Sequence, residues 1–293
     1  MNMCLDCIPC FVRQAVDAVR LSGAPEEEQN RLMQRILQWL ADIDLRLPPP
    51  AASQRIHRRL RALLPTDDPY FASKKHHNDL AARLVPSIRR RIAASHDPLA
   101  MAVRYAITGN IIDLGAKNNV GFGEIYSELQ SAPMQPVFGD LNVFKEKLLR
   151  AQTILYLADN AGEIFFDRLL IEQLVHAKVT LAVRGAPVLN DATRSDARQA
   201  RIDEIAQIID NGSDAPGTLL DDCTEDFRRR FDEADLIIAK GQGNYESLSE
   251  AHREVFFLFR TKCPVISRHS GFSMGTYVAA NRQSEPHTPG GGA

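Results

Sequence analysis

The segment Ile154-Leu155-Tyr156-Leu157-Ala158-Asp159-Asn160-Ala161-Gly162-Glu163 is the strongest indication of the fold. Its apolar run ends abruptly at a carboxylate and an amide, turns at a glycine, and continues into a sequence with helical character. This order is typical of a parallel strand whose carboxyl end forms a ligand site in an open α/β sheet. Adjacent Asp and Asn side chains offer oxygen ligands that suit Mg²⁺, Mn²⁺ or a related divalent ion. Taken alone, the segment also fits a strand, turn and helix with simple polar capping.

The rest of the second half of the chain supports the interpretation of residues 154–163 as a parallel strand that ends in a ligand site. Beyond about residue 135, short β-rich runs alternate with amphipathic segments such as 164–176 and 192–200. This alternation predicts an α/β fold, with a three-layer α/β/α core and a mainly parallel sheet. The expected strands are residues 153–158, 179–183, 206–209, 236–239 and 255–258, and a further candidate strand is 265–267.

The first third of the chain has the periodicity of helices. Apolar residues recur at helical spacing before Gly23, again after Pro25, and again after the Pro48-Pro49-Pro50 run. Further helical stretches are expected at 78–94 and 98–108. The predicted organisation is a helical N-terminal region (1–134), an α/β core that binds metal and phosphate (135–280), and a polar, glycine-rich, disordered tail (281–293).

Composition excludes several classes of function. The 293 residues include 35 basic and 37 acidic side chains, for a formal net charge of −2, which argues against nucleic acid as the main partner. No apolar run approaches the roughly 18 residues that a membrane-spanning helix needs, and the N-terminus lacks the features of a secretory signal. Five cysteines without an export signal make a disulfide framework improbable. We therefore expect a cytoplasmic protein with no membrane or nucleic-acid partner.

Polar residues follow three of the expected strands. They are Asp159-Asn160, with Glu163 at the opening of the next helix, then residues 184–193 from Arg184 to Thr193, and finally residues 240–246 from Lys240 to Glu246. Because the carboxyl ends of parallel strands share one edge of a sheet, these segments are expected to converge.

The residue types at these ends suit phosphoryl chemistry. Asp159, Asn160 and Asp191 can hold a divalent cation and leave positions open for water and substrate. Lys240 and Arg184 can neutralise phosphate oxygens, and the Gly241 and Gly243 positions let backbone N–H groups approach an anion. Each piece also has a simpler interpretation: Asp191 as a helix cap, Lys240 as a surface charge, and Gly-Gln-Gly as a plain turn.

A fourth polar segment lies upstream. In Thr108-Gly109-Asn110-Ile111-Ile112-Asp113, an amide and a carboxylate are three residues apart and share one face if the segment is helical. Asn110 and Asp113 are therefore candidates to line the cleft from the helical side. The alternative is a capped turn between two helices.

Together these motifs resemble the damage-control phosphatases, a metal-dependent family first catalogued as a domain of unknown function. The similar segments are Asp-Asn-Ala-Gly-Glu at 159–163, Arg-Gly-x-Pro-x-x-Asn-Asp-Ala-Thr at 184–193, and Lys-Gly-Gln-Gly-Asn-Tyr-Glu at 240–246. The Gly-Asn-x-x-Asp at 109–113 and an N-terminal Cys-x-x-Cys resemble the shorter prokaryotic branch. The resemblance covers about residues 4 to 278.

The resemblance implies an α/β/α core with a helical N-terminal region, and hydrolysis of phosphomonoesters with Mn²⁺, Co²⁺, Ni²⁺ or Mg²⁺. It implies Asp159, Asn160 and Asp191 as metal ligands and Lys240 as a phosphate ligand. Family members often have Lys where this chain has Arg184, which keeps the charge but changes the hydrogen-bond geometry. It also places Glu163, Arg184 and Asn110 near the phosphate. The full set of predicted substrate- and phosphate-binding residues is Asn110, Arg184, Lys240, Gly241, Gly243 and Asn244.

The expected reaction is attack on a small phosphorylated metabolite (a sugar phosphate, a nucleotide or a damaged phosphometabolite) by a metal-activated water. Asp113 or Glu163 is the expected group that positions this water or takes its proton. A covalent intermediate on Asp159 is less favoured, because Asp159 is not part of an Asp-x-Asp pattern.

Two rival functions are a non-catalytic module that binds phosphometabolites and a carboxylate methyltransferase. The second ranks low, because no G-x-G-x-x-G turn follows the first strand. The physiological substrate, the metal and the oligomeric state stay open at this stage.

The N-terminal cysteines allow three interpretations. Cys4, Cys7 and Cys10 form a C-x₂-C-x₂-C run, whereas Cys223 and Cys263 are remote in sequence. In a helix, residues three apart share a face and pack as small apolar side chains. The other interpretations are a structural or accessory metal site and a redox role.

Overall fold

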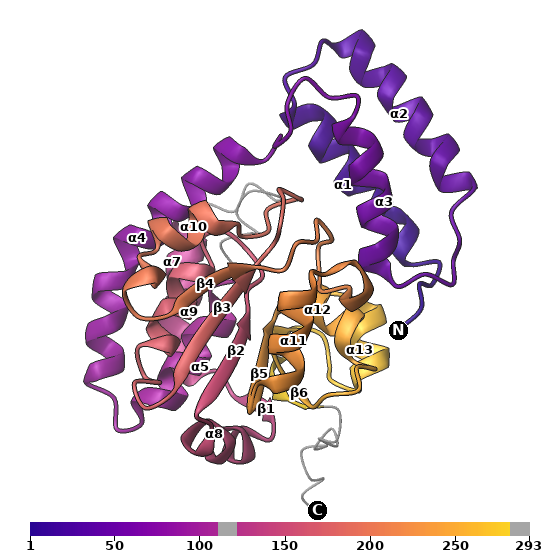
Figure 1. Ribbon diagram of the computed structural model, residues 1–293. Helices are drawn as coiled ribbons and strands as arrows, with labels where there is room; N and C mark the ends of the chain where they lie inside the picture. The colour runs from indigo at the N-terminus through magenta and orange to yellow at the C-terminus, as the bar shows by residue number, and fades with distance from the viewer. Residues whose placement is uncertain (111–121, 282–293) are drawn as a thin grey trace, which may run out of the picture.

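The computed structural model describes residues 1–110 and 122–281 of the chain, and Figure 1 shows how they are arranged. The N-terminal third is helical, as the sequence predicts. Two prolines occupy the first turn of α3, where the missing N–H costs no hydrogen bond. The helices of this part are α1 (Cys7–Leu21), α2 (Glu26–Ala41), α3 (Pro49–Arg61), α4 (Phe71–Ala93), α5 (Pro98–Thr108) and α7 (Phe122–Ser131).

Strands and helices alternate from residue 137 onwards. The strands are β1 (Val137–Gly139), β2 (Thr153–Leu157), β3 (Lys178–Val183), β4 (Gln207–Asp210), β5 (Leu236–Lys240), β6 (Val255–Arg260) and β7 (Tyr277–Ala280). The helices between them are α8 (Leu141–Arg150), α9 (Ile164–Ile171), α10 (Arg194–Gln199), α11 (Glu225–Glu233), α12 (Gly241–Leu248) and α13 (Pro264–Ser270). Short 3₁₀ helices occur at Ala132–Met134, Ile202–Glu204 and Leu220–Asp222 (η1 to η3).

The described residues form one seven-stranded sheet with the order β1-β7-β6-β5-β2-β3-β4. Strands β6, β5, β2, β3 and β4 are parallel, whereas β7 runs antiparallel to β6 and pairs in parallel with β1. From β2 the chain proceeds through β3 and β4 on one side, and then returns to place β5 and β6 on the other side. The carboxyl ends of β2 and β5 therefore flank a topological switch point, where α/β sheets bind ligands.

Helices cover both faces of the sheet and give the three layers that the sequence predicts. Alternation along each strand assigns its side chains to two separate cores. In β2, Ile154 and Tyr156 pack with α4, α5, α8 and α9, whereas Leu155 and Leu157 pack on the other face with α11, α12 and α13. Nearly every strand residue of β2, β3, β5 and β6 is buried, as expected for parallel strands covered on both sides.

The N-terminal helices do not form a single unit. Helices α1, α2 and α3 share a third apolar core, which includes Phe11, Ile36 and Leu60 together with Val188 and Leu189 from the loop after β3. Helices α4, α5 and α7, which the sequence groups with them in residues 1–134, instead contribute to the core on the sheet. Figure 1 shows α1 to α3 standing beyond the edge of the sheet where α12 and α13 begin.

The candidate strand at residues 265–267 is part of helix α13. The Cys263 Sγ accepts the Ile266 N–H at 3.4 Å, Pro264 occupies the first turn, and Gly271 ends the helix in the left-handed conformation at φ 77°. Three apolar or small residues are too short a run to distinguish a strand from a helix turn. Strands β1 and β7 were not predicted. The expected disordered tail, 281–293, lies outside the described residues except for Asn281.

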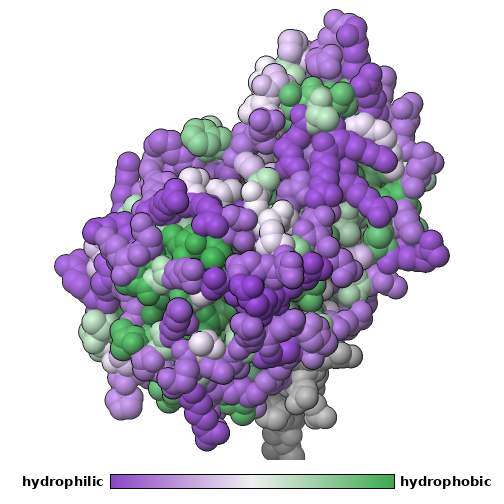
Figure 2. Space-filling view, in the orientation of Figure 1, coloured by the Kyte–Doolittle hydropathy of each residue, from purple (hydrophilic) through white to green (hydrophobic). Residues whose placement is uncertain are grey.

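No helix among the described residues is long and apolar enough to cross a membrane. The face of the molecule in Figure 2 is mainly hydrophilic, and its apolar side chains form separate groups rather than one continuous surface.

Candidate active site

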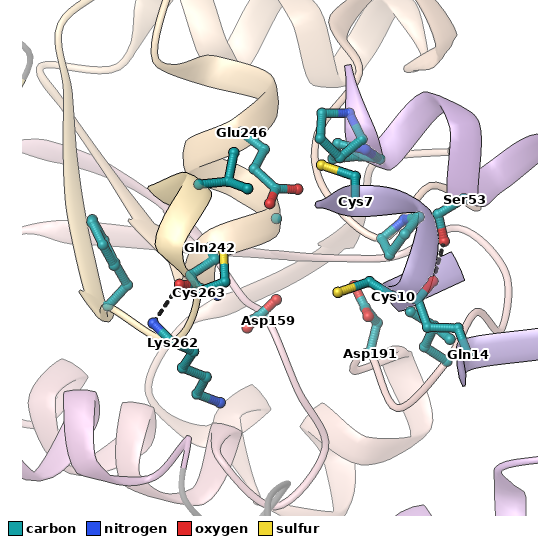
Figure 3. A pocket seen from close by; sticks show the side chains of 18 of the residues that line it. Cys7, Cys10, Gln14, Ser53, Asp159, Asp191, Gln242, Glu246, Lys262 and Cys263 are labelled. Carbon is teal, nitrogen blue, oxygen red and sulfur yellow. Dashed lines mark hydrogen bonds between the residues drawn. The ribbon is translucent and has the colours of Figure 1, made fainter. Parts of the chain in front are cut away.

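A cavity of about 300 Å³ lies at the carboxyl ends of β2, β3 and β5. This size suits a small metabolite. Its floor comes from the sheet edge and includes Asp159, Asn160 and Asp191, and its wall comes from α1 and α3. Figure 3 shows Asp159 and Asp191 facing the same space, with Cys10 and Gln14 of α1 on the Asp191 side.

Two polypeptide segments fix the floor. Asn160 and Asp191 form an isolated antiparallel bridge, and the N–H of Ala192 donates to the carbonyl oxygen of Asp159 at 2.8 Å. The Asn190 side chain also donates to Asn160 Oδ1 at 2.7 Å. The sequence segments after β2 and β3 therefore meet, as the parallel-sheet argument predicts.

The Asp159 carboxylate is held from three sides. It accepts hydrogen bonds from the side-chain amides of Asn160 at 2.7 Å and Asn110 at 3.1 Å. Gly241 closes the third side: a Cβ at this position would lie 1.9 Å from Asp159 Oδ2, and its φ of +75° also favours glycine. Only glycine allows the first turn of α12 to pack so closely on this carboxylate.

Arg184 links the two carboxylates. Its Nε lies 2.6 Å from Asp191 Oδ2, and one terminal nitrogen lies 3.8 Å from Asp159 Oδ1. One guanidinium therefore reaches both acids, which places them close together. Arg184 is buried and does not line the cavity, so its role in this geometry is to pair with the acids rather than to face a ligand.

The structure places Lys240 differently from the expectation of a phosphate ligand. Its ammonium is fully buried beneath the floor and donates to Ala106 O at 2.8 Å, Glu163 Oε1 at 2.7 Å and Asp167 Oδ1 at 2.5 Å. All three N–H donors are therefore used within the protein. Burial lowers the pKa of Lys240, but the two carboxylates outweigh this effect and leave the pKa above its usual value.

Glu163 lies in the same buried cluster and does not line the cavity. Besides Lys240, its carboxylate accepts from the side-chain amides of Asn110 at 2.7 Å and Asn160 at 2.9 Å. Glu163 thus orients two amides that face the cavity. Among the residues that the structure describes, Asn110 Oδ1 is a buried acceptor without a hydrogen-bond partner.

The two other candidates in the 240–246 segment have different surroundings. Asn244 is fully buried and bonds to Lys240 O at 2.8 Å, Ala158 O at 3.2 Å and Thr218 Oγ1 at 2.8 Å, which connects β2, β5 and the loop before α11. Gly243 lines the cavity, and a Cβ there would lie 2.2 Å from Pro216 O. Asn244 therefore fixes the scaffold, whereas Gly243 allows the Pro216 backbone to pack closely against the first turn of α12.

The floor has an excess of negative charge. Burial, followed by the neighbouring Glu163 and Asp191 carboxylates, raises the pKa of Asp159 well above its usual range. A divalent cation would balance this charge, and the Asn110 oxygen beside Asp159, a buried acceptor without a hydrogen-bond partner, would be available to it as a further oxygen ligand. The buried charges of this cluster are four carboxylates (Asp159, Glu163, Asp167, Asp191) and two cations (Arg184, Lys240).

Sequence reasoning missed Lys262, which follows β6 and lines the cavity. Its Nζ donates to the carbonyl oxygen of Asn110 at 3.2 Å, and its backbone N–H donates to Gln242 Oε1 at 2.7 Å (Figure 3). The rule that identified the other strand ends applies equally to the end of β6. By contrast, no local signal marks Gln14 or Ser53, which also line the cavity, whereas Glu246 is the last residue of the predicted 240–246 segment.

The predicted base Asp113 lies outside the described residues, so its role stays a prediction.

The N-terminal cysteines receive no support as an accessory metal site. Within residues 1–110 and 122–281, no group of three His, Cys, Asp or Glu side chains is placed to hold a metal. The cavity floor is not such a group, because its candidate ligands are the carboxylates of Asp159 and Asp191 and the amide of Asn160. Cys7 is buried, and burial raises the pKa of its thiol to about 12, which suits structural packing.

The fold and the site define an α/β protein whose sheet edge carries an acidic, oxygen-lined cavity. A family model described as the damage-control phosphatase ARMT1-like domain matches residues 3–278. The chain therefore belongs to the damage-control phosphatase family.

Relatives of nearly full length support this assignment. A damage-control phosphatase of Archaeoglobus fulgidus is 34% identical, with 93% of this chain and 96% of that protein covered. An uncharacterized protein of Methanocaldococcus jannaschii is 34% identical over 94% of both chains. The crystal structure of a DUF89 family protein from Pyrococcus horikoshii matches with a TM-score of 0.89 at 30% identity, covering 97% of this chain and 100% of that one.

Proposed function

We propose that this protein is a metal-dependent phosphatase that hydrolyses phosphomonoesters of small metabolites, such as sugar phosphates, nucleotides or damaged phosphometabolites. Membership of a damage-control phosphatase family supports phosphatase activity. The observation that carries the finer proposal is the convergence of Asp159, Asn160 and Asp191 on the floor of a cavity of metabolite size.

These three residues would hold the divalent cation, which is Mn²⁺, Co²⁺, Ni²⁺ or Mg²⁺ because all four accept oxygen ligands. When bound, the cation would supply Lewis-acid activation of the phosphoryl group and a water of lowered pKa. Glu163 accepts from the Asn160 amide and thereby directs the oxygen of that side chain. Arg184 similarly holds Asp191. Both are positioning residues, since neither lines the cavity.

The substrate phosphate is assigned to the cavity-facing side of the floor. Lys262 supplies positive charge there, and Gly241 and Gly243 line the same cavity at the start of α12. We assign Lys240 to support of Glu163 and Asp167 instead of direct phosphate binding, because its three donors are already used. Charge that develops on the phosphoryl oxygens would be stabilised by Lys262 and the cation together.

The test is turnover of p-nitrophenyl phosphate with each of Mn²⁺, Co²⁺, Ni²⁺ and Mg²⁺ after treatment with a chelator. Activity should return with at least one metal. Asp159→Asn should lower kcat/KM by about 10³-fold, because it removes one anionic ligand, and should abolish thermal stabilisation by the metal. The matched control is Asp232→Asn, an exposed carboxylate far from the cavity that should behave as wild type.

The same experiment separates the rival, a non-catalytic module that binds phosphometabolites. Thermal stabilisation by phosphate esters without hydrolysis under any metal would support the rival, because a ligand that prefers the folded state raises stability by mass action. That result would overturn the phosphatase proposal.

A further inference from the structure

The cavity has a second polar end, formed by Glu246 of α12. Figure 3 shows its carboxylate in the space between α12 and Cys7 of α1, at the end of the cavity remote from Asp159 and Asp191. No described residue donates a hydrogen bond to this carboxylate, although the α-amino group of Met1 lies nearby, donating to the backbone oxygen of Glu246 at 3.1 Å and pairing with Glu250 at 3.7 Å. Glu246 is therefore an anionic acceptor that faces the cavity.

Helix geometry sets its distance from the reactive end. Glu246 lies five residues after Gly241, which contacts Asp159, so its Cα is about 7.5 Å further along the axis of α12. Gln242 and Glu246 are four residues apart and thus share one face of this helix. Both line the cavity. A ligand with its phosphate on the floor would need several atoms to reach Glu246.

Gln242, one turn before Glu246 on α12, has a hydrogen-bond donor to spare. Its side-chain oxygen accepts the Lys262 N–H at 2.7 Å, which leaves its amide NH₂ for a ligand. On the α1 side, Cys7 is the labelled residue that faces Glu246 in Figure 3. This end of the cavity therefore presents one carboxylate acceptor and one amide donor.

We propose that Glu246 is a specificity-determining residue that accepts a hydrogen bond from a hydroxyl or ammonium group of the substrate, at the end remote from the phosphate. This inference rests on the proposed function, because it takes the floor as the site of the phosphate. An ester with only apolar atoms at that end would displace water from the half-buried carboxylate without offering it a partner, which disfavours its binding. The helical wall and α12 thus select the substrate, while the floor performs the reaction.

The experiment compares matched alkyl phosphates of roughly three to six carbons with their ω-hydroxy and ω-amino counterparts, a span chosen from the distance along α12. Both hydrolysis and thermal stabilisation are measured in the presence of Mn²⁺. For at least one chain length, wild type should prefer the polar-ended ester by about 10-fold or more in kcat/KM and should be stabilised more by it. Glu246→Ala should reduce that ratio to about 1.

Two further variants complete the experiment: the first distinguishes a hydroxyl donor from an ammonium donor on the substrate, and the second is the matched control. Glu246→Gln keeps an acceptor but loses the charge, so it should retain a preference for the hydroxy ester and lose any preference for the amino ester. Glu250→Gln alters an exposed carboxylate just beyond α12 and should keep the wild-type ratios.

The outcomes separate the two proposals. A wild-type preference that persists in Glu246→Ala, or wild type with no preference at any length, would overturn this inference. Preferential stabilisation by the polar-ended esters without hydrolysis would support the role of Glu246 and overturn the proposed phosphatase activity.

Discussion

The floor of the cavity and its helical wall are held by different kinds of interaction. On the floor, Asp159, Asn160 and Asp191 are joined by backbone hydrogen bonds and by side chains that are almost fully buried. The wall is formed by α1 and α3, which share a separate apolar core with α2. The floor is thus part of the sheet core, whereas the wall is an attached layer.

One polar cluster fastens this wall to the sheet. Asp214, in the loop between β4 and α11, accepts from Gln54 at 2.8 Å and pairs with Arg58 and Arg61, all from α3. Arg58 is about half exposed. Because exposed ion pairs contribute little to stability, this attachment is weaker than the buried floor. The candidate reactive groups thus lie on the sheet core, whereas the α1 and α3 side of the cavity is attached to that core through a partly exposed polar cluster.

The largest effect is expected from Lys240→Met, which removes the only cation in contact with Glu163 and Asp167 among the described residues. Two buried carboxylates would remain unpaired, and breaking such a pair costs about 3–5 kcal/mol. Urea unfolding should detect this loss, and kcat should fall with little change in KM if Lys240 supports the floor. A rise in KM alone would instead favour direct phosphate binding. Lys147→Met, at a partly exposed ion pair, is the control.

A smaller effect is expected from Gly241→Ala, which tests how tightly the floor is packed. The added Cβ would overlap the Asp159 carboxylate, and the residue would be held at a φ of +75°. Backbone strain of this kind costs on the order of 1–3 kcal/mol. Activity should fall by about 10–100-fold, as expected for misplaced reacting groups. Gly23→Ala also has a positive φ but meets nothing within 4 Å, so it should lose stability without losing activity.

The wall should respond differently. Asp214→Asn weakens the attachment of α3, and we expect a loss of about 1–2 kcal/mol because the partners are only partly buried. KM should rise several-fold while kcat stays near the wild-type value. An equal fall in kcat would show that the wall also positions the reactive groups, and would remove the distinction between the two regions. Asp226→Asn, at an exposed pair on α11, is the control.

The smallest effect concerns pH. Burial raises the pKa of Glu246 from 4.5 to about 7, although the Met1 amino group opposes this shift. A carboxyl group with a raised folded-state pKa contributes most below its unfolded pKa, and this contribution is lost as the pH rises through the folded value. Glu246→Gln cannot ionise, so it should become more stable than wild type as the pH rises from 4.5 to 8, with convergence near pH 4.5. Unfolding curves of wild type and Glu246→Gln at pH 4.5 and pH 8 check this. The same difference in unfolding free energy at both pH values would contradict the prediction.

Much of the floor was predictable because parallel strands place their carboxyl ends at one edge. That rule brought Asp159, Asn160 and Asp191 together from segments thirty residues apart. Applied also to β6, it would have found Lys262. The rule does not say which way a side chain at a strand end points, and this is where the expectation for Lys240 and the structure differ.

Alternation along β5 explains that difference. Leu236, Ile238 and Lys240 are two residues apart and face the same side of the sheet, where the apolar residues of α5 and α9 pack. Lys240 therefore extends under α9 to Asp167 instead of into the cavity. Period-two reasoning could have assigned the face, but the acidic partners on α9 become evident only when the helix is placed.

The amino-acid sequence by itself determined the α/β class, the parallel strands and the acidic residues at their ends, because hydrophobic periodicity and strand-end position are local properties. Only the tertiary structure decided which charged groups are buried as supports, as with Lys240, and which face the cavity, as with Lys262 and Glu246. The physical reason is that burial and hydrogen-bond partners depend on elements distant in sequence, here α1, α3, α5 and α9, whose packing no local pattern encodes.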